Sequence, residues 1–163
     1  LWAASSTKDA DVFLVLRLFD PEGTEVLFQG ANDPRAPIAM GWLRASHREV
    51  EPKRSLPGRP YHPHKRVEPL EPRQIYELTI EIWPTCIVVP LGYRLALSVL
   101  GQDFDHGLPP AVMGSTGLAM RGAGPFLHDD PHDRPDEIFD NEVTIYTGPE
   151  HPSHLMLPII PDG

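Results

Sequence analysis

Alternation of apolar and polar residues is clearest between residues 70 and 104. Across Tyr76–Ile82, apolar side chains alternate with glutamate and threonine, which is the period of a strand with one dry face and one wet face. The alternation returns across Tyr93–Val99, and Pro90-Leu91-Gly92 has the composition of a tight turn between the arms. These residues predict a strand, a turn and a second strand, with a bulge or a change of sheet at Trp83-Pro84.

Shorter apolar runs predict the other strands. Residues 11–20 are apolar on both faces, as expected for a central strand of a sandwich or one pressed against another domain. The order Asp20-Pro21-Glu22-Gly23 is that of a type I turn, which predicts a returning partner strand at residues 24–29. Residues 101–139 are predicted to be mostly irregular. Further strands are predicted at residues 1–4, 39–46, 142–147 and 154–160.

Composition agrees with many short strands. The 163 residues include 20 Pro and 13 Gly, which favours irregular loops over long helices. About eight strands and no convincing amphipathic helix predict a single all-β domain over residues 1–163, a two-sheet antiparallel jelly-roll sandwich. Residues 48–69 contain five prolines and predict a long excursion, which in a compact domain is usually functional or packed on a neighbour.

Charge and hydropathy narrow the range of partners. The net charge is −9, but residues 42–73 hold eight Lys or Arg against four Asp or Glu, whereas residues 101–163 hold two Arg against eleven acids. An acidic chain with no helix or aromatic platform to present its basic segment is not expected to bind nucleic acid. No run of about 18 apolar residues predicts a membrane span, and no secretion leader is recognisable.

The start of the chain indicates a longer protein. It begins at Leu1 without a Met and enters a strand-like pattern almost at once, which predicts an N-terminally truncated part of a longer protein.

The one cysteine, Cys86, cannot form an internal disulfide and lies in an apolar run, which predicts a buried, inert thiol. The cellular compartment therefore stays open, with the cytoplasm preferred.

No nucleophile with its partner groups is recognisable. The G-x-S-x-G pattern of an α/β-hydrolase is absent, and Gly114-Ser115-Thr116-Gly117 is only an echo of it, in a Gly-rich loop with no helix behind. Neither His62-Pro63-His64 nor the acids and histidines of residues 128–136 match a zinc or calcium motif. Solvated or salt-bridged loop residues are preferred over a metal site, with calcium at the acidic cluster as the alternative. No catalytic residue, metal or cofactor is therefore predicted.

The three tryptophans leave two interpretations open. Trp2, Trp42 and Trp83 each lie within or beside a strand-like apolar run, so packing in the core or against another domain is preferred over a sugar-stacking platform. An independent carbohydrate-binding module is the alternative function, since jelly rolls often bind sugars, although a fold alone does not establish a function.

Five stretches of the chain carry a family resemblance. They are SSTKDADVFLVLRLFDPEG, GWLRASHRE, RPYHPH, LEPRQIYELTIEIWPTCIVVPLGYRLALSVLGQDF and TGPEHPSHLMLPIIP. The most specific elements are the Asp9-Ala10-Asp11 entry to a strand, the Trp83-Pro84 break with the turn that follows it, and His151-Pro152-Ser153 before a Leu-rich run. Together they resemble the C-terminal non-catalytic domain of X-Pro dipeptidyl-peptidases and cocaine-esterase-like (CocE/NonD) hydrolases, from about Ser5 to Pro161.

The resemblance implies a jelly roll with a galactose-binding-like fold that follows an α/β-hydrolase domain in the same polypeptide. The serine nucleophile, acid and histidine of such families lie in the hydrolase domain, so no catalytic residue is carried over to this chain, which is expected to be inactive alone. The implied role is to pack on the upstream domain of a serine hydrolase and help to shape its pocket and often its oligomer. The pairing of GWLRASHRE with RPYHPH favours ester or acyl/amide substrates, while X-Pro dipeptidyl substrates stay open.

Aromatic and basic residues in and beside the long excursion form the predicted interdomain or pocket-shaping surface, because interfaces are enriched in such residues. They are Trp42, Arg44, His47, Arg48, Tyr61, His62 and His64.

Overall fold

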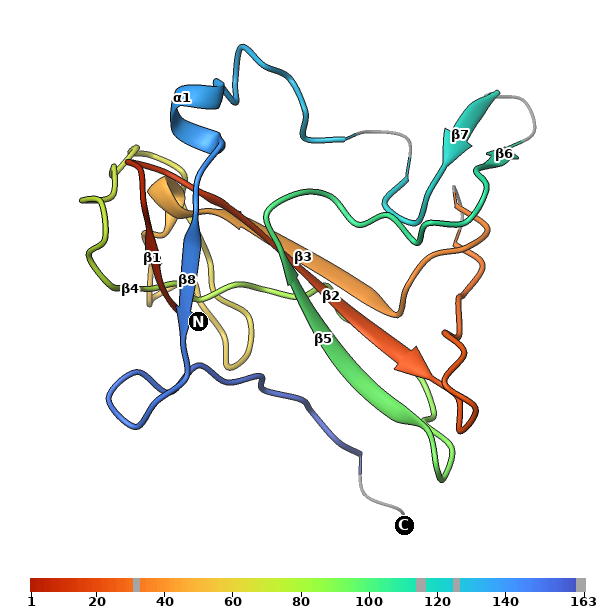
Figure 1. Ribbon diagram of the computed structural model, residues 1–163. Coiled ribbons are helices and arrows are strands. Elements are labelled where there is room, and N and C mark those ends of the chain that lie inside the picture. Colours follow the sequence, from red (N-terminus) through yellow and green to blue (C-terminus); the bar gives the residue numbers. More distant parts are fainter. Residues whose placement is uncertain (31–32, 114–116, 125–126, 161–163) are drawn as a thin grey trace.

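Strand β2 (Asp11–Phe19) lies at the centre of one of two three-stranded sheets in the computed structural model, which describes residues 1–30, 33–113, 117–124 and 127–160 (Figure 1). It pairs antiparallel with β3 (Ala39–Arg44) and β5 (Arg94–Leu100). In the second sheet, β1 (Trp2–Ser5) lies between β4 (Tyr76–Glu77) and β8 (Val143–Tyr146), and both pairings are again antiparallel. The predicted all-β, two-sheet antiparallel sandwich is confirmed.

Connections cross repeatedly between the two sheets, as in a jelly roll. The links from β1 to β2, from β3 to β4 and from β4 to β5 each change sheet. The predicted irregular region after β5 contains three short elements that the sequence did not indicate. They are β6 (Ala111–Met113), its antiparallel partner β7 (Leu118–Met120) and the one-turn helix α1 (Asp136–Phe139). A 3-10 turn, η1 (Ala45–His47), ends β3.

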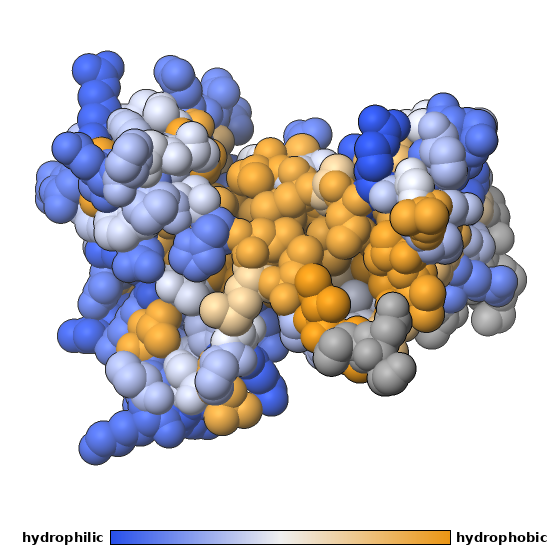
Figure 2. All heavy atoms as spheres, turned by 90° about the horizontal axis from the view of Figure 1, so that it is seen from below, coloured by the Kyte–Doolittle hydropathy of each residue, from blue (hydrophilic) through white to orange (hydrophobic). Residues whose placement is uncertain are grey.

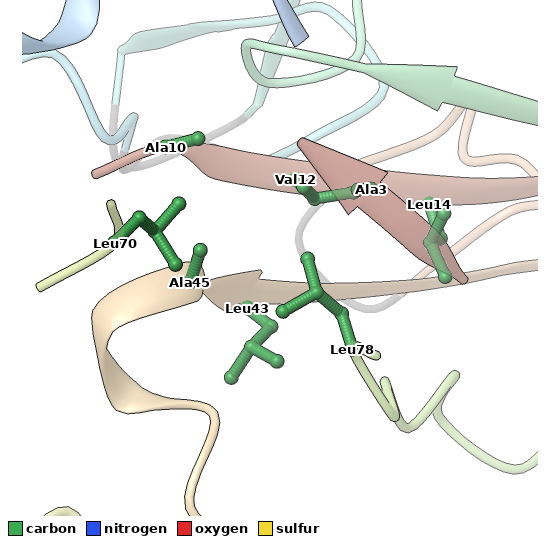
Figure 3. Close-up of a cluster of buried hydrophobic side chains, with 8 residues drawn as sticks. All are labelled: Ala3, Ala10, Val12, Leu14, Leu43, Ala45, Leu70 and Leu78. Atoms are coloured by element: carbon green, nitrogen blue, oxygen red, sulfur yellow. The ribbon is translucent and has the colours of Figure 1, made fainter. Parts of the chain in front are cut away.

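One cluster of buried apolar side chains joins the two sheets (Figure 3). Strand β2 contributes Val12 and Leu14, its neighbour β3 contributes Leu43, and β1 of the second sheet contributes Ala3. The cluster is completed by Ala10, Ala45, Leu70 and Leu78. Because β2 is buried on both faces, as its sequence predicts, it is the strand on which the rest of the sheet is assembled.

The arms at residues 76–82 and 93–99 belong to different sheets, so they do not pair as one hairpin, but the predicted change of sheet near Trp83-Pro84 is confirmed. β4 has two residues and pairs with β1, whereas β5 pairs with β2. Residues 78–83 instead run against β3, where the Trp83 N–H donates to Met40 O at 2.9 Å. Pro84 and Pro90 have no N–H to donate, so the connection cannot continue a ladder. The turn itself is confirmed, since Tyr93 N–H donates to Pro90 O at 3.2 Å and Gly92 has a φ of 86°.

Of two other predicted strands, one forms only in part and the other does not form. The turn at Asp20–Gly23 forms, with Gly23 N–H donating to Asp20 O at 3.0 Å. Residues 24–29 return against the end of β2, where Val26 N–H donates to Leu18 O at 2.8 Å, but they make only single bridges and no continuous strand. Residues 154–160 join no sheet. Just before this segment, the Ser153 hydroxyl donates to Tyr146 O of β8 at 2.5 Å and accepts the Trp2 N–H of β1 at 2.8 Å. Ser153 thus uses backbone groups at the ends of β8 and β1 that a further strand would need for pairing.

The prediction of a buried Cys86 is wrong as well. Its apolar run lies in the connection between the two sheets, and the thiol is exposed. Of the Gly114–Gly117 echo, residues 114–116 lie outside the described residues.

Candidate functional site

A groove of about 690 Å³ opens beside β3, between the 48–69 excursion, the 78–83 segment and the chain before α1. Six of the seven predicted surface residues line it, although they come from two separate stretches of sequence. They are Trp42, Arg44, His47, Tyr61, His62 and His64.

The seventh residue, Arg48, lies outside this lining. Its guanidinium stacks over the Tyr76 ring at 4.5 Å and donates to Glu68 O at 2.5 Å and Ala45 O at 3.2 Å. Arg48 therefore holds the end of the excursion against η1 instead of facing a ligand.

Three histidines lie together on one wall. His64 Nδ1 is 3.1 Å from His47 Nδ1, so one ring donates and the other accepts. His62 has backbone oxygens at both ring nitrogens, Glu49 O at 3.0 Å from Nδ1 and Thr79 O at 2.9 Å from Nε2. Burial, followed by the neighbouring charges of His47 and His62, lowers the pKa of His64. These rings fasten the excursion to η1 and to the 78–83 segment.

An ion-pair network forms the opposite wall. Asp11, the first residue of β2, accepts from Arg44 Nε at 3.2 Å and from Arg134 Nε at 2.6 Å. Arg44 also forms a two-pronged pair with Asp133, with both N···O distances 3.0 Å. Burial alone would lower the pKa of Arg44, but the hydrogen bonds to Asp133 and Asp11 more than offset this and raise it. The hydrogen bond from Arg44 lowers the pKa of Asp133. Two guanidinium groups and two carboxylates thus balance in charge.

Aromatic side chains form the part of the groove next to β3. The Trp42 and Trp83 rings meet at 5.4 Å between centroids and 45° between planes, and the two residues are 43% and 62% exposed. The His128 ring lies between Trp42, at 5.2 Å, and Phe13, at 5.3 Å. His128 Nδ1 is 3.0 Å from Asp103 Oδ1, and its backbone N–H donates to Asp103 Oδ2 at 2.6 Å. The predicted packing role of the tryptophans therefore accounts for only part of their surface.

The outer rim carries two more arginines. Arg54 lies over the Tyr61 ring at 3.6 Å, and Arg59 Nε is 3.4 Å from Glu81 Oε1. Within the described ranges, no group of three or more His, Cys, Asp or Glu residues is arranged to hold a metal ion. Among the same residues, no helix is both long and apolar enough to cross a membrane.

Among the groove residues that the sequence did not indicate are Asp11, Trp83, His128 and Arg134. Trp83 and His128 had been noted, but for packing and for the acidic cluster. The uneven charge of residues 42–73 and 101–163 is a signal for the Arg44–Asp133 pair, but not for Arg134, whose partner Asp11 lies outside both segments.

A second surface is apolar and lies along β5. Register places Val99 opposite Leu14 and Leu95 opposite Leu18, so these β5 side chains point toward the second sheet. Leu95 and Val99 nevertheless remain exposed, as do Met156 and Ile159 of the C-terminal segment. The view from below, the side on which Figure 1 places that segment, shows apolar side chains gathered in a central hollow (Figure 2).

Comparisons with known proteins agree on one relationship. Residues 1–156 match the family model described as X-Pro dipeptidyl-peptidase C-terminal non-catalytic domain. Two crystal structures of a CocE/NonD family hydrolase from Staphylococcus aureus are similar. One has 28% sequence identity and a TM-score of 0.64, covering 76% of this chain and 22% of that chain. The other has 27% identity and a TM-score of 0.65, covering 80% and 23%. The chain thus spans less than a quarter of those hydrolases. A search of curated proteins found no match.

Proposed function

This chain belongs to the family of X-Pro dipeptidyl-peptidase C-terminal non-catalytic domains, and we propose that it is the accessory β-sandwich of a serine hydrolase that cleaves ester or acyl/amide bonds. It packs on an upstream α/β-hydrolase domain of the same polypeptide and shapes one wall of the substrate pocket. The observation that carries the proposal is the family match along residues 1–156 of a chain that covers only 22% and 23% of the similar hydrolases.

The apolar surface supports packing against another domain. Leu95 and Val99 are oriented toward the sandwich interior but remain partly exposed, and exposed apolar patches bordered by polar residues mark interaction surfaces. Closing this surface would remove apolar area from water, which stabilises an interface by roughly 25 cal/mol per Å². A homo-oligomer formed through the same surface is the competing use of this face.

The groove supports the pocket-shaping role. Its polar walls are pre-organised by ion pairs and histidine contacts, while its aromatic wall is left open. Such a combination suits a surface that meets substrate more than one that packs permanently on protein. Ester and acyl/amide substrates are preferred, and X-Pro dipeptides are the second substrate class to assay.

Separating the chain from its parent tests the proposal. The complete hydrolase is expected to turn over p-nitrophenyl acetate or butyrate, or an X-Pro p-nitroanilide, and to lose that activity on treatment with a serine-directed phosphonate. The chain of 163 residues alone is expected to show no turnover above buffer. Phosphonate-sensitive ester hydrolysis by the chain alone would contradict the accessory role.

A photo-crosslinking residue at Leu95 locates the packing surface. A crosslink within one polypeptide of the complete hydrolase supports domain packing, whereas crosslinked dimers favour the oligomer. Light scattering on the same sample provides the mass independently.

A further inference from the structure

The aromatic wall of the groove combines an open ring surface with a fixed hydrogen-bond acceptor. We propose that it binds a ring with one apolar face and a hydroxyl group at its edge, as found in a pyranoside or in a phenol. The ring lies on Trp83 beside Trp42, and the hydroxyl donates to His128 Nε2. Ligand binding at this site can be measured on the chain alone and does not depend on the proposed function. Only a role of the site in turnover by the complete hydrolase rests on the proposed function.

The ring surface follows from the angle between the two indoles. With 45° between their planes, Trp42 and Trp83 form a wedge and not a flat platform, which suits one ring better than an extended chain of rings. Trp83 is the more exposed at 62%, so its indole is the free surface. Trp42 contacts both Trp83 and His128 and orients the wedge toward the hydrogen-bonding group. Stacking or CH–π contact with an indole favours flat apolar faces, whether aromatic or sugar.

The acceptor follows from the contact between His128 and Asp103. A carboxylate only accepts, so the short contact to Asp103 Oδ1 requires the proton on Nδ1 and leaves Nε2 of the neutral ring with a lone pair. Within the described part of the chain, Nε2 makes no hydrogen bond, and the residue lines the groove. Phe13 and Trp42 hold the ring at two sides, so its orientation is set before a ligand arrives.

Polar groups at the rim suit further hydroxyl or carbonyl groups on the same ligand. Arg54 stacks on Tyr61, and among the described residues it forms no ion pair. The Glu81 carboxylate, held near Arg59, adds an acceptor on the other side. The rim therefore offers both a donor and an acceptor within one groove.

Fluorescence titration of the purified chain tests the proposal. The probes are methyl β-D-glucopyranoside and 4-methylphenol, with toluene as a ring without a hydroxyl and glycerol as hydroxyls without a ring. Saturable binding of at least one ring alcohol, tighter than either control compound, is expected. If neither ring alcohol binds saturably, or if toluene or glycerol binds equally well, the site is refuted. Binding of the glucopyranoside would identify the ligand as a sugar, and binding of 4-methylphenol would identify it as a phenol.

Matched variants locate the binding. Trp83→Ala is expected to weaken binding about tenfold, since the loss of one aromatic contact is worth about 1.4 kcal/mol, equivalent to a factor of ten. Trp2→Phe removes a tryptophan outside the groove lining and should leave the affinity unchanged. Equal affinity of Trp83→Ala and the parent chain would overturn the site. Trp83→Phe, which keeps a ring, should recover most of the binding and excludes misfolding as the cause.

Asp103→Asn tests the acceptor. The amide no longer imposes the Nδ1–H form on His128, so the affinity for the ring alcohol should fall several-fold while that for toluene stays unchanged. The ¹⁵N chemical shift of His128 Nε2 should be that of a bare nitrogen in the parent chain and should move on addition of the ring alcohol. An Nε2 that carries its proton in the unbound chain, or does not respond to the probe, contradicts the role.

The two proposals can fail separately. If the complete hydrolase cleaves esters while the chain binds neither probe, the ring-alcohol site falls and the accessory role stands. If the chain binds a probe but Trp83→Ala leaves the KM of the complete hydrolase unchanged for ring-alcohol esters, the pocket-shaping role falls and the binding site stands.

Discussion

Leu14 and Val99 lie directly opposite each other on β2 and β5, yet Leu14 is 5% exposed and Val99 is 39% exposed. Both side chains are on the face that points toward the second sheet. On the β2–β3 side, β1 and the segment around Leu78 cover that face and complete the buried cluster (Figure 3). Along β5 the cover is incomplete, and the surface stays apolar (Figure 2).

Leu14 and Val99 lie on the same face, so the difference in their exposure comes from the layer packed against that face and not from the residues of the strand itself. The alternation in β5 has the period of a strand with one covered face. In the described residues, that cover is only partly present. The closed region supplies folding stability, while the open region leaves apolar side chains exposed to water.

Truncating the two opposed residues gives the largest expected contrast. Leu14→Ala leaves a cavity in the closed region and should lower the free energy of unfolding by about 3 kcal/mol. Val99→Ala removes two methyl groups already in contact with water and should cost about 1 kcal/mol or less. Urea unfolding followed by circular dichroism measures both. Similar losses for the two variants would mean that β5 is covered in solution.

Gly41 of β3 lies opposite Leu14 of the closed region and packs closely against Glu81, which lines the groove. Its substitution should give the next largest loss of unfolding free energy. A Cβ at this position would lie 2.0 Å from Glu81 O, so the backbone of the 78–83 segment would have to move. Gly41→Ala should cost about 2 kcal/mol and separate Trp83 from Trp42. Near-ultraviolet circular dichroism of the indoles, compared with the Ala substitution of Gly101, where no atom lies within 4 Å, isolates the contact. An unchanged indole signal in Gly41→Ala would be inconsistent with the close approach.

The histidine contact gives the smallest effect, which depends on pH. The pKa of His64 is lowered from its ordinary value of 6.5, mainly by burial and then by His47 and His62. The unfolded chain therefore binds a proton more readily than the folded chain, so this contribution to stability is complete above pH 6.5 and is lost as the pH falls below it. His64→Asn should make the dependence of unfolding free energy on pH shallower between pH 7 and 5. An identical slope in both proteins would remove His64 as its source.

Local patterns predicted the elements better than their partners. The strand at residues 11–20 and the turn at Asp20–Gly23 depend on residues adjacent in sequence, and both were predicted correctly. The break at Trp83-Pro84 correctly predicted a change of sheet between residues 76–82 and 93–99, but not which strands the two arms join, because pairing depends on which distant strand each arm meets. Periodicity still described the first arm, where Leu78 is buried and Thr79 is exposed without a ladder.

The groove shows the same division. Composition indicated the aromatic and basic residues of the excursion, and six of the seven came together because the excursion folds back over β3. The pairing of His128 with Asp103 joins residues 25 positions apart, in a region without a regular pattern. Only the fold reveals that contact. Arg48 matched the composition but is used for internal packing, a distinction that charge alone does not make.

The exposed connection between β4 and β5 makes this domain a natural candidate for a split protein. A break near Val88 gives one fragment with β1 to β4 and another with β5 to β8. Each fragment then holds strands of both sheets, so neither sheet can be completed by one fragment alone. Reassembly would have to restore the β2–β5 and β1–β8 ladders together, which would make recovery of the fold a cooperative signal that two fused partners had met.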